Sequence, residues 1–172
     1  MKDRKYAFMW DLLGDIELGR PNLGSFTRIE VYRLMQYTLR DVIEAKLGTD
    51  ATDEIFYEAG KMAGFAFFEH FLAGTKDVGE FARKLQSVLK EMKIGVLRIE
   101  SMTEGAEKLI LTVDEDLDCS GLPEIGDEVC VYDEGFIAGI LENFTGKSYH
   151  VKEIDCWCTG NRTCRFTADL TA

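Results

Sequence analysis

The hydrophobic pattern changes its period near Gly95, and this change constrains the fold more than any other feature. Over 55–66, apolar and small side chains recur every three or four residues, which is the spacing of one helical face. Over 97–100 and 109–113, apolar residues alternate with their neighbours, which is the spacing of a strand. Helices followed by strands of this kind favour an α+β fold, here a mostly antiparallel four-stranded sheet packed with several helices.

Glycines, prolines and capping residues set the expected ends of these elements. Residues 14–24 contain three glycines and Pro21, so we expect turns around short extended pieces there. The other expected elements are helices from about 27 to Gly48, from Asp50 onward and from Asp77 to Gly95, strands on either side of Glu104-Gly105, a helix ending at Gly146, and strands near 148–157 and 164–170. No Gly/Ser-rich or low-complexity stretch divides the sequence, so residues 1–172 are expected to form a single domain.

The charge balance excludes some partners. The chain has 31 acidic and 20 basic residues and a formal charge of −11, which repels phosphate backbones and anionic membranes, so we expect neither nucleic acid nor membrane as a partner. The start of the chain is charged, and the apolar stretch that follows is interrupted by Asp11, so it is too short for a signal peptide and indicates a cytoplasmic protein. Five cysteines in a reducing compartment indicate metal ligands or buried thiols.

Motifs for catalysis or phosphate binding are not evident. The chain has no Gly-x-Gly-x-x-Gly after a strand, no phosphate-binding loop, no serine elbow and no His-Glu-x-x-His. The glycine pairs Gly60/Gly64 and Gly135/Gly139 have helical spacing, and we interpret them as devices that let another element approach closely. We therefore lean towards a protein that is not an enzyme and assign no catalytic residue.

Four residues near the end of the chain have the donor atoms of a structural zinc site. Zinc takes thiolate, imidazole and carboxylate ligands in a tetrahedron, and Cys130, Glu153, Cys156 and Cys164 would supply four of them. Glu153 and Cys156 are three apart, so they need a bulge or a strand end to converge. A disulfide between Cys156 and Cys164, and reduced thiols that only fill the core, remain open alternatives.

The segment from Cys130 through Gly135, Gly139 and Gly146 to Glu153-Ile154-Asp155-Cys156, and then Gly160, Cys164 and Phe166, resembles the C-terminal signature of the 4-vinyl reductase, or hydrocarbon-binding, family. This family is related to the sensor domains of phenol-responsive activators and to TRAPP-complex subunits. The resemblance implies a ligand-binding fold of the NO-signalling and Golgi-transport type and a homodimer. It also implies zinc at Cys130, Glu153, Cys156 and Cys164, while Cys119 and Cys158 have no place in the pattern.

Aromatic residues are dense over 65–71. From the sequence alone this density indicates core, whereas the resemblance implies that part of it encloses a small apolar or aromatic molecule. The expected pocket residues are Phe56, Met62, Phe67, His70, Phe71, Phe136 and Ile140. His70 is the best candidate to anchor a polar group, although a structural histidine is the more common case.

These observations favour a small-molecule sensor or carrier domain with a structural zinc ion. An accessory protein in tetrapyrrole vinyl reduction, after which the family is named, is an alternative that a bound pigment or flavin would favour. An assembly subunit of the TRAPP type is another, and the absence of a cavity would favour it.

Overall fold

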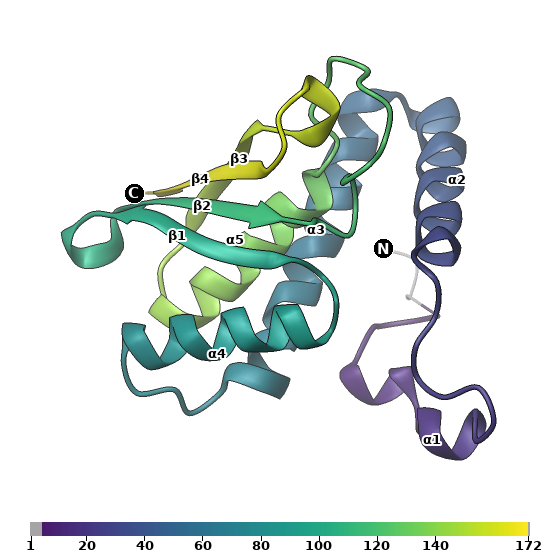
Figure 1. Cartoon of the computed structure of the whole chain (residues 1–172), viewed down its shortest axis with the longest axis horizontal. Helices are drawn as coiled ribbons and strands as arrows, with labels where there is room; N and C mark the ends of the chain where they lie inside the picture. Colours follow the sequence, from purple (N-terminus) through teal and green to yellow (C-terminus); the bar gives the residue numbers. More distant parts are fainter. Residues whose placement is uncertain (1–4, 172) are drawn as a thin grey trace.

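The computed structural model describes residues 5–171 (Figure 1). Part of the charged start of the chain, residues 1–4, lies outside the described residues. Four strands form one sheet: β1 (Val96–Met102), β2 (Lys108–Asp114), β3 (Tyr149–Asp155) and β4 (Cys164–Leu170). Their order is β1-β2-β4-β3 and every neighbouring pair is antiparallel, which confirms the predicted α+β class.

Four longer helices accompany the sheet: α2 (Ile29–Leu47), α3 (Thr49–Phe67), α4 (Val78–Glu91) and α5 (Val131–Thr145). A π-helical turn (Phe68–Leu72) continues α3. α4 begins where the sequence predicted, because the side chain of Asp77 accepts a hydrogen bond from the Glu80 amide at 2.8 Å. α5 ends at Gly146, whose φ of 70° is the left-handed conformation that favours glycine.

The segment before α2 differs from the expected extended pieces. It forms a 3₁₀ turn (Trp10–Leu13) and a short helix, α1 (Ile16–Gly19). Asp15 caps α1, since its side chain accepts a hydrogen bond from the Leu18 amide at 2.8 Å. The glycines at 14 and 19 indicate chain reversals correctly, but the aspartate between them starts a helical turn.

Figure 1 shows the sheet lying over α4 and α5, with α3 crossing on the far side of α5. Glycines make the α3–α5 contact close: a Cβ at Gly60 would lie 2.0 Å from the Tyr132 carbonyl oxygen, and one at Gly135 would lie 2.0 Å from the Tyr57 carbonyl oxygen. Gly64 and Gly139 meet the opposite helix backbone in the same way, at 2.2 Å. The interpretation of both glycine pairs as packing devices is confirmed.

α2 stands beside this body (Figure 1), and every one of its residues keeps part of its side chain exposed. It is held to the loop after β2 mainly by polar contacts: Tyr32 and Gln36 donate to the two carboxylate oxygens of Asp118, both at 2.7 Å, and Arg33 donates to the Leu117 carbonyl at 2.8 Å. Among residues 5–171, no helix has both the length and the apolarity needed to cross a membrane.

Candidate metal centre and ligand cavity

Four cysteine side chains meet at one end of the sheet. Cys119 comes from the loop after β2, Cys130 from the N-cap of α5, Cys156 from the end of β3 and Cys164 from the first residue of β4. All four are buried, and their sulfur atoms lie within 4.8 Å of one another. The separations are 3.1 Å for Cys119–Cys164, 3.9 Å for Cys130–Cys164 and 4.0 Å for Cys130–Cys156.

The chemistry and spacing of this cluster fit a tetrahedral metal ion. Zinc–sulfur bonds of about 2.3 Å place the sulfurs of a regular tetrahedron about 3.8 Å apart. The two separations that involve Cys130 match this value, and the Cys119–Cys164 pair is somewhat closer. All five cysteines are free thiols, so the structure does not contain the alternative disulfide between Cys156 and Cys164. A closed set of four thiolates leaves no position for a substrate, as in a structural site.

Protonation also favours a cation in the cluster. The pKa of Cys156 is strongly lowered, because the thiols of Cys119, Cys130 and Cys164 surround its sulfur as hydrogen-bond partners. Contacts with Cys119, Cys156 and Cys164 raise the pKa of Cys130 above that of a free thiol, and contacts with Cys119 and Cys156 raise the pKa of Cys164. A metal ion would supply the positive charge that several neighbouring thiolates need.

Glu153, the fourth predicted ligand, lies next to the cluster but outside this group of four. Its Oε2 atom accepts a hydrogen bond from the Cys130 amide at 3.2 Å, and its Oε1 atom is buried without a hydrogen-bond partner in the described structure. Burial, followed by the nearby Cys156, raises the pKa of Glu153 to about 8. The bulge that the sequence required is present: the pairing of β3 with β4 shifts between Glu153 and Asp155.

Cys119 takes the fourth position in the cluster, which the sequence analysis gave to Glu153. Its amide donates to Oδ1 of Asp116 at 3.1 Å, and the Asp118 amide donates to the same oxygen at 2.8 Å. This aspartate turn directs the cysteine towards the start of β4. The Asp-x-x-Cys spacing is the only local signal, and it does not reveal which distant element the turn approaches. Cys158 is buried outside the group of four, and burial raises its pKa to about 12.

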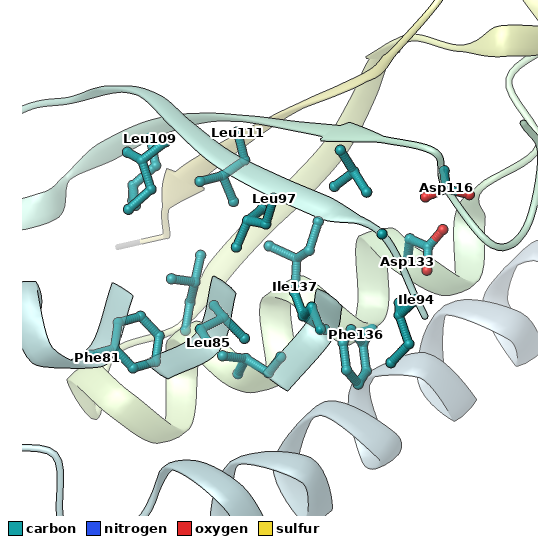
Figure 2. A pocket seen from close by; sticks show the side chains of 16 residues that line it. Phe81, Leu85, Ile94, Leu97, Leu109, Leu111, Asp116, Asp133, Phe136 and Ile137 are labelled. Atoms are coloured by element: carbon teal, nitrogen blue, oxygen red, sulfur yellow. The ribbon is translucent and has the colours of Figure 1, made fainter. Parts of the chain in front are cut away.

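A narrow cavity of about 50 Å³ lies between α4, α5, β1 and β2 (Figure 2). Its walls are aliphatic and aromatic side chains apart from Gly95 and two carboxyl groups, those of Asp116 and Asp133. Most of the wall is buried core, but Ile94, Ile99, Asp133, Phe136 and Ile137 are only partly buried. The cavity is therefore dry and apolar over most of its length, as small-molecule sites commonly are.

The structure does not bring the seven predicted pocket residues together. Phe136 and Ile140 line this cavity. Met62 and His70 border a shallow hollow beside Trp10, and Phe56 borders another between α2 and α3. Phe67 and Phe71 pack against each other with ring centroids 4.9 Å apart.

His70 also belongs to this aromatic packing. Its ring stacks on Trp10 with centroids 4.3 Å apart, and this places it in the hollow beside Trp10. The aromatic density of α3 and the π-helical turn therefore builds core contacts. Apart from Phe136, Ile140 and other residues of α5, the cavity wall comes from apolar residues of α4 and the strands, which the sequence presented as ordinary core.

Comparison with known proteins agrees with these features. The family model of the V4R domain matches residues 109–170, which run from β2 to β4 and include all four clustered cysteines. Over these residues the chain is similar to the V4R domain. A protein of Methanocaldococcus jannaschii, described as uncharacterised, is 29% identical over 149 residues, which cover 86% of this chain and 81% of that protein. The resemblance to the 4-vinyl reductase family is confirmed.

Solved structures share the fold at low sequence identity. A vinyl-4-reductase family protein from M. jannaschii has a TM-score of 0.65 at 18% identity, covering 97% of this chain and 99% of that one. A trafficking protein particle complex subunit 3 from Naegleria fowleri, covalently bound to palmitic acid, has 0.62 at 16%, covering 84% and 95%. The phenol-responsive sensory domain of the transcription activator PoxR, solved with phenol, has 0.60 at 15%, covering 85% and 76%.

Proposed function

We propose that this V4R domain is a sensor or carrier domain that binds a small apolar or aromatic molecule in the cavity between α4, α5 and the sheet. The observation that carries the proposal is the apolar cavity itself, whose walls join the α4 helix to the part of the chain that matches the V4R model. The fold is shared with a sensory domain that was solved with phenol, and this supports the same kind of role.

The size of the cavity limits how it can be filled. About 50 Å³ holds a few water molecules, whereas a cavity of about 150 Å³ is known to bind benzene. An aromatic ligand therefore requires the wall to move outward. Phe136 and Ile137 are partly buried and can change rotamer at lower cost than the closely packed leucines of β2. We infer that binding widens the cavity on its α5 side.

Toluene is a suitable first probe, because it has the apolar character of the walls. At ten times its Kd, toluene is expected to stabilise the folded protein by about 1.4 kcal/mol and to raise the Tm by about 3–5 °C. Ile137→Phe, which fills part of the cavity, is expected to abolish this shift. The measurement is thermal unfolding followed by circular dichroism over a toluene titration.

The matched control is Leu23→Phe, an aliphatic-to-aromatic change at an exposed position before α2, and its Tm should shift with toluene as that of the wild type does. A Tm that does not respond to toluene or to phenol in the wild type contradicts the ligand-binding function and favours an assembly subunit. An equal response in Ile137→Phe places binding elsewhere on the molecule.

We further propose that Cys119, Cys130, Cys156 and Cys164 hold a structural zinc ion. The four sulfurs fit the tetrahedron, and they join the loop after β2, the start of α5 and the β3–β4 pair. In this arrangement Glu153 is a positioning residue, because its carboxylate holds the Cys130 amide at 3.2 Å. The metal closes the fold beside the cavity and supplies no catalytic step.

We also propose that the protein forms a homodimer, and the exposed apolar side chains of α2 support this. Val31, Leu34, Met35, Leu39 and Val42 on α2 are all at least half exposed, and patches of this kind on soluble proteins often mark interfaces. Leu34→Glu is expected to convert a dimer into a monomer in light scattering coupled to gel filtration. Ile154→Glu, at an exposed isoleucine of β3, is the control and should leave the mass unchanged. A wild-type monomer would contradict the proposal.

A further inference from the structure

The two ends of the cavity differ in chemistry. Figure 2 shows Phe81 and Leu109 at one end and the carboxyl groups of Asp116 and Asp133 together at the other. The oxygens of these two carboxyl groups lie within 4.8 Å of each other. Every other wall residue is apolar or glycine, so the carboxyl pair provides the only charged side chains of the described cavity wall. A bound molecule would meet polar groups at this end alone.

The shielded carboxyl oxygen of Asp133 is not explained by any contact within the described protein. It lies in the first turn of α5, and its Oδ2 atom is shielded from solvent and has no hydrogen-bond partner in the described structure. Folded proteins pair nearly all such atoms, and an exception calls for a reason such as a missing partner molecule. Its neighbour is different: Oδ1 of Asp116 already accepts hydrogen bonds from the amides of Asp118 and Cys119. Asp116 is thus fixed by the loop, and Asp133 is the carboxyl group that lacks a partner.

The protonation of the pair agrees with this role. Burial raises the pKa of Asp116 to about 7, and burial together with the charges of Asp118 and Asp116 raises the pKa of Asp133 well above its ordinary value. The surrounding groups that act on Asp133 are acids and thiols, namely Asp116, Asp118, Glu153 and Cys119. The described cavity wall has no basic side chain, and the nearby Arg33 of α2 donates instead to the Asp116 backbone carbonyl at 3.4 Å.

We propose that Asp133, placed beside Asp116, binds the polar head of the ligand, and that the cavity selects small apolar molecules that end in a hydrogen-bond donor, a hydroxyl or amino group, and rejects carboxylates. This inference rests on the proposed ligand-binding function and names its chemical class. The donor of the head group gives Oδ2 of Asp133 the partner that it lacks. The body of the molecule lies among the aliphatic side chains of α4, β1 and β2.

The test compares four probes of nearly the same shape, toluene, phenol, aniline and benzoate, by isothermal titration calorimetry. Phenol and aniline are expected to bind roughly tenfold or more tightly than toluene, which is the effect of one hydrogen bond to a carboxyl group, and benzoate is expected to bind most weakly. Asp133→Leu should reduce the affinity for phenol to that for toluene, and it should leave the affinity for toluene unchanged or raise it. The same variant should unfold at an equal or higher temperature, because an unpartnered polar atom has been removed.

Asp133→Asn keeps the shape and a hydrogen-bonding oxygen, so it should retain the preference for phenol and weaken the rejection of benzoate. This variant preserves the test if Asp133→Leu does not fold. Asp41→Asn, at an exposed position of α2, is the control and should behave as the wild type. Equal affinity for toluene and phenol, unchanged in Asp133→Leu, overturns the inference while leaving ligand binding intact. A second equivalent of zinc that Asp133→Asn removes also overturns it, since Asp116, Cys130 and Asp133 would then hold a metal. If none of the four probes binds, the proposed function fails together with the inference.

Discussion

Replacing Gly135 by alanine is expected to lower the free energy of unfolding by about 3 kcal/mol or more. The added Cβ would lie 2.0 Å from the Tyr57 carbonyl oxygen and 2.9 Å from the Lys61 amide nitrogen of α3. Both neighbours are backbone atoms, so relief requires α3 and α5 to move apart along their whole contact. This places the change at the upper end of the cost of overpacking, about 1–3 kcal/mol, and outweighs the gain of about 1 kcal/mol in helix propensity.

Urea unfolding followed by circular dichroism measures this loss, and a shift of the Tm by about 10 °C is the thermal counterpart. Gly19→Ala is the control, because a Cβ at Gly19 meets no heavy atom within 4 Å. That variant should stay within about 0.5 kcal/mol of the wild type, as surface substitutions usually do. A loss below 1 kcal/mol for Gly135→Ala would show that the two helices are not in backbone contact.

This contact is also an example of what the sequence could predict. Each pair of glycines spaced four apart on an otherwise apolar helix marks a face that another backbone approaches, and Gly60/Gly64 and Gly135/Gly139 gave that signal. The sequence did not say that the two pairs face each other. The strands and helices were predicted for the same local reason, since hydrophobic periodicity and caps such as Asp77 are properties of neighbouring residues.

The cysteine cluster shows which contacts local sequence patterns predict and which they do not. Cys130, Cys156 and Cys164 lie at the ends of periodic elements, so their approach could be anticipated from a hairpin and the helix before it. Cys119 lies in a loop without periodicity. Only the packing of that loop against β4 brings its sulfur to 3.1 Å from that of Cys164. The predicted pocket residues are scattered for a related reason: aromatic residues such as Phe67 and Phe71 pack against one another, whereas the cavity lies where aliphatic side chains do not fill the space.

The loop after β2 connects the three features on which the proposals rest. Asp116 lines the cavity, Cys119 belongs to the cysteine cluster, and Asp118 receives the hydrogen bonds of Tyr32 and Gln36 from α2. These residues lie within one turn of chain, so a displacement of the loop moves all three contacts together.

Removing one proposed metal ligand of the cluster is therefore expected to have the largest effect on the stability of the whole molecule. Cys130→Ser should abolish stoichiometric zinc and lower the Tm by roughly 8–16 °C, because a ligand at 1,000 times its Kd contributes about 4 kcal/mol and each kcal/mol shifts the Tm of a chain of this size by about 2–4 °C. Cys130 is the residue to change, since its sulfur is close to those of both Cys156 and Cys164. Plasma emission spectrometry measures the metal, and calorimetry with and without a chelator measures the Tm.

Cys158→Ser is the matched control, because Cys158 is equally buried but lies outside the group of four. It should retain zinc and its response to the chelator, with only the loss of about 1–3 kcal/mol that an imperfectly paired buried hydroxyl causes. Glu153→Gln tests whether Cys119 or Glu153 is the fourth ligand. If Glu153 only positions the Cys130 amide, this variant keeps one zinc per chain with reduced affinity. Loss of zinc in Glu153→Gln together with its retention in Cys119→Ser would make the carboxylate the fourth ligand. A folded wild type without metal would contradict the site altogether, since four buried thiols at these separations would then pack only as core.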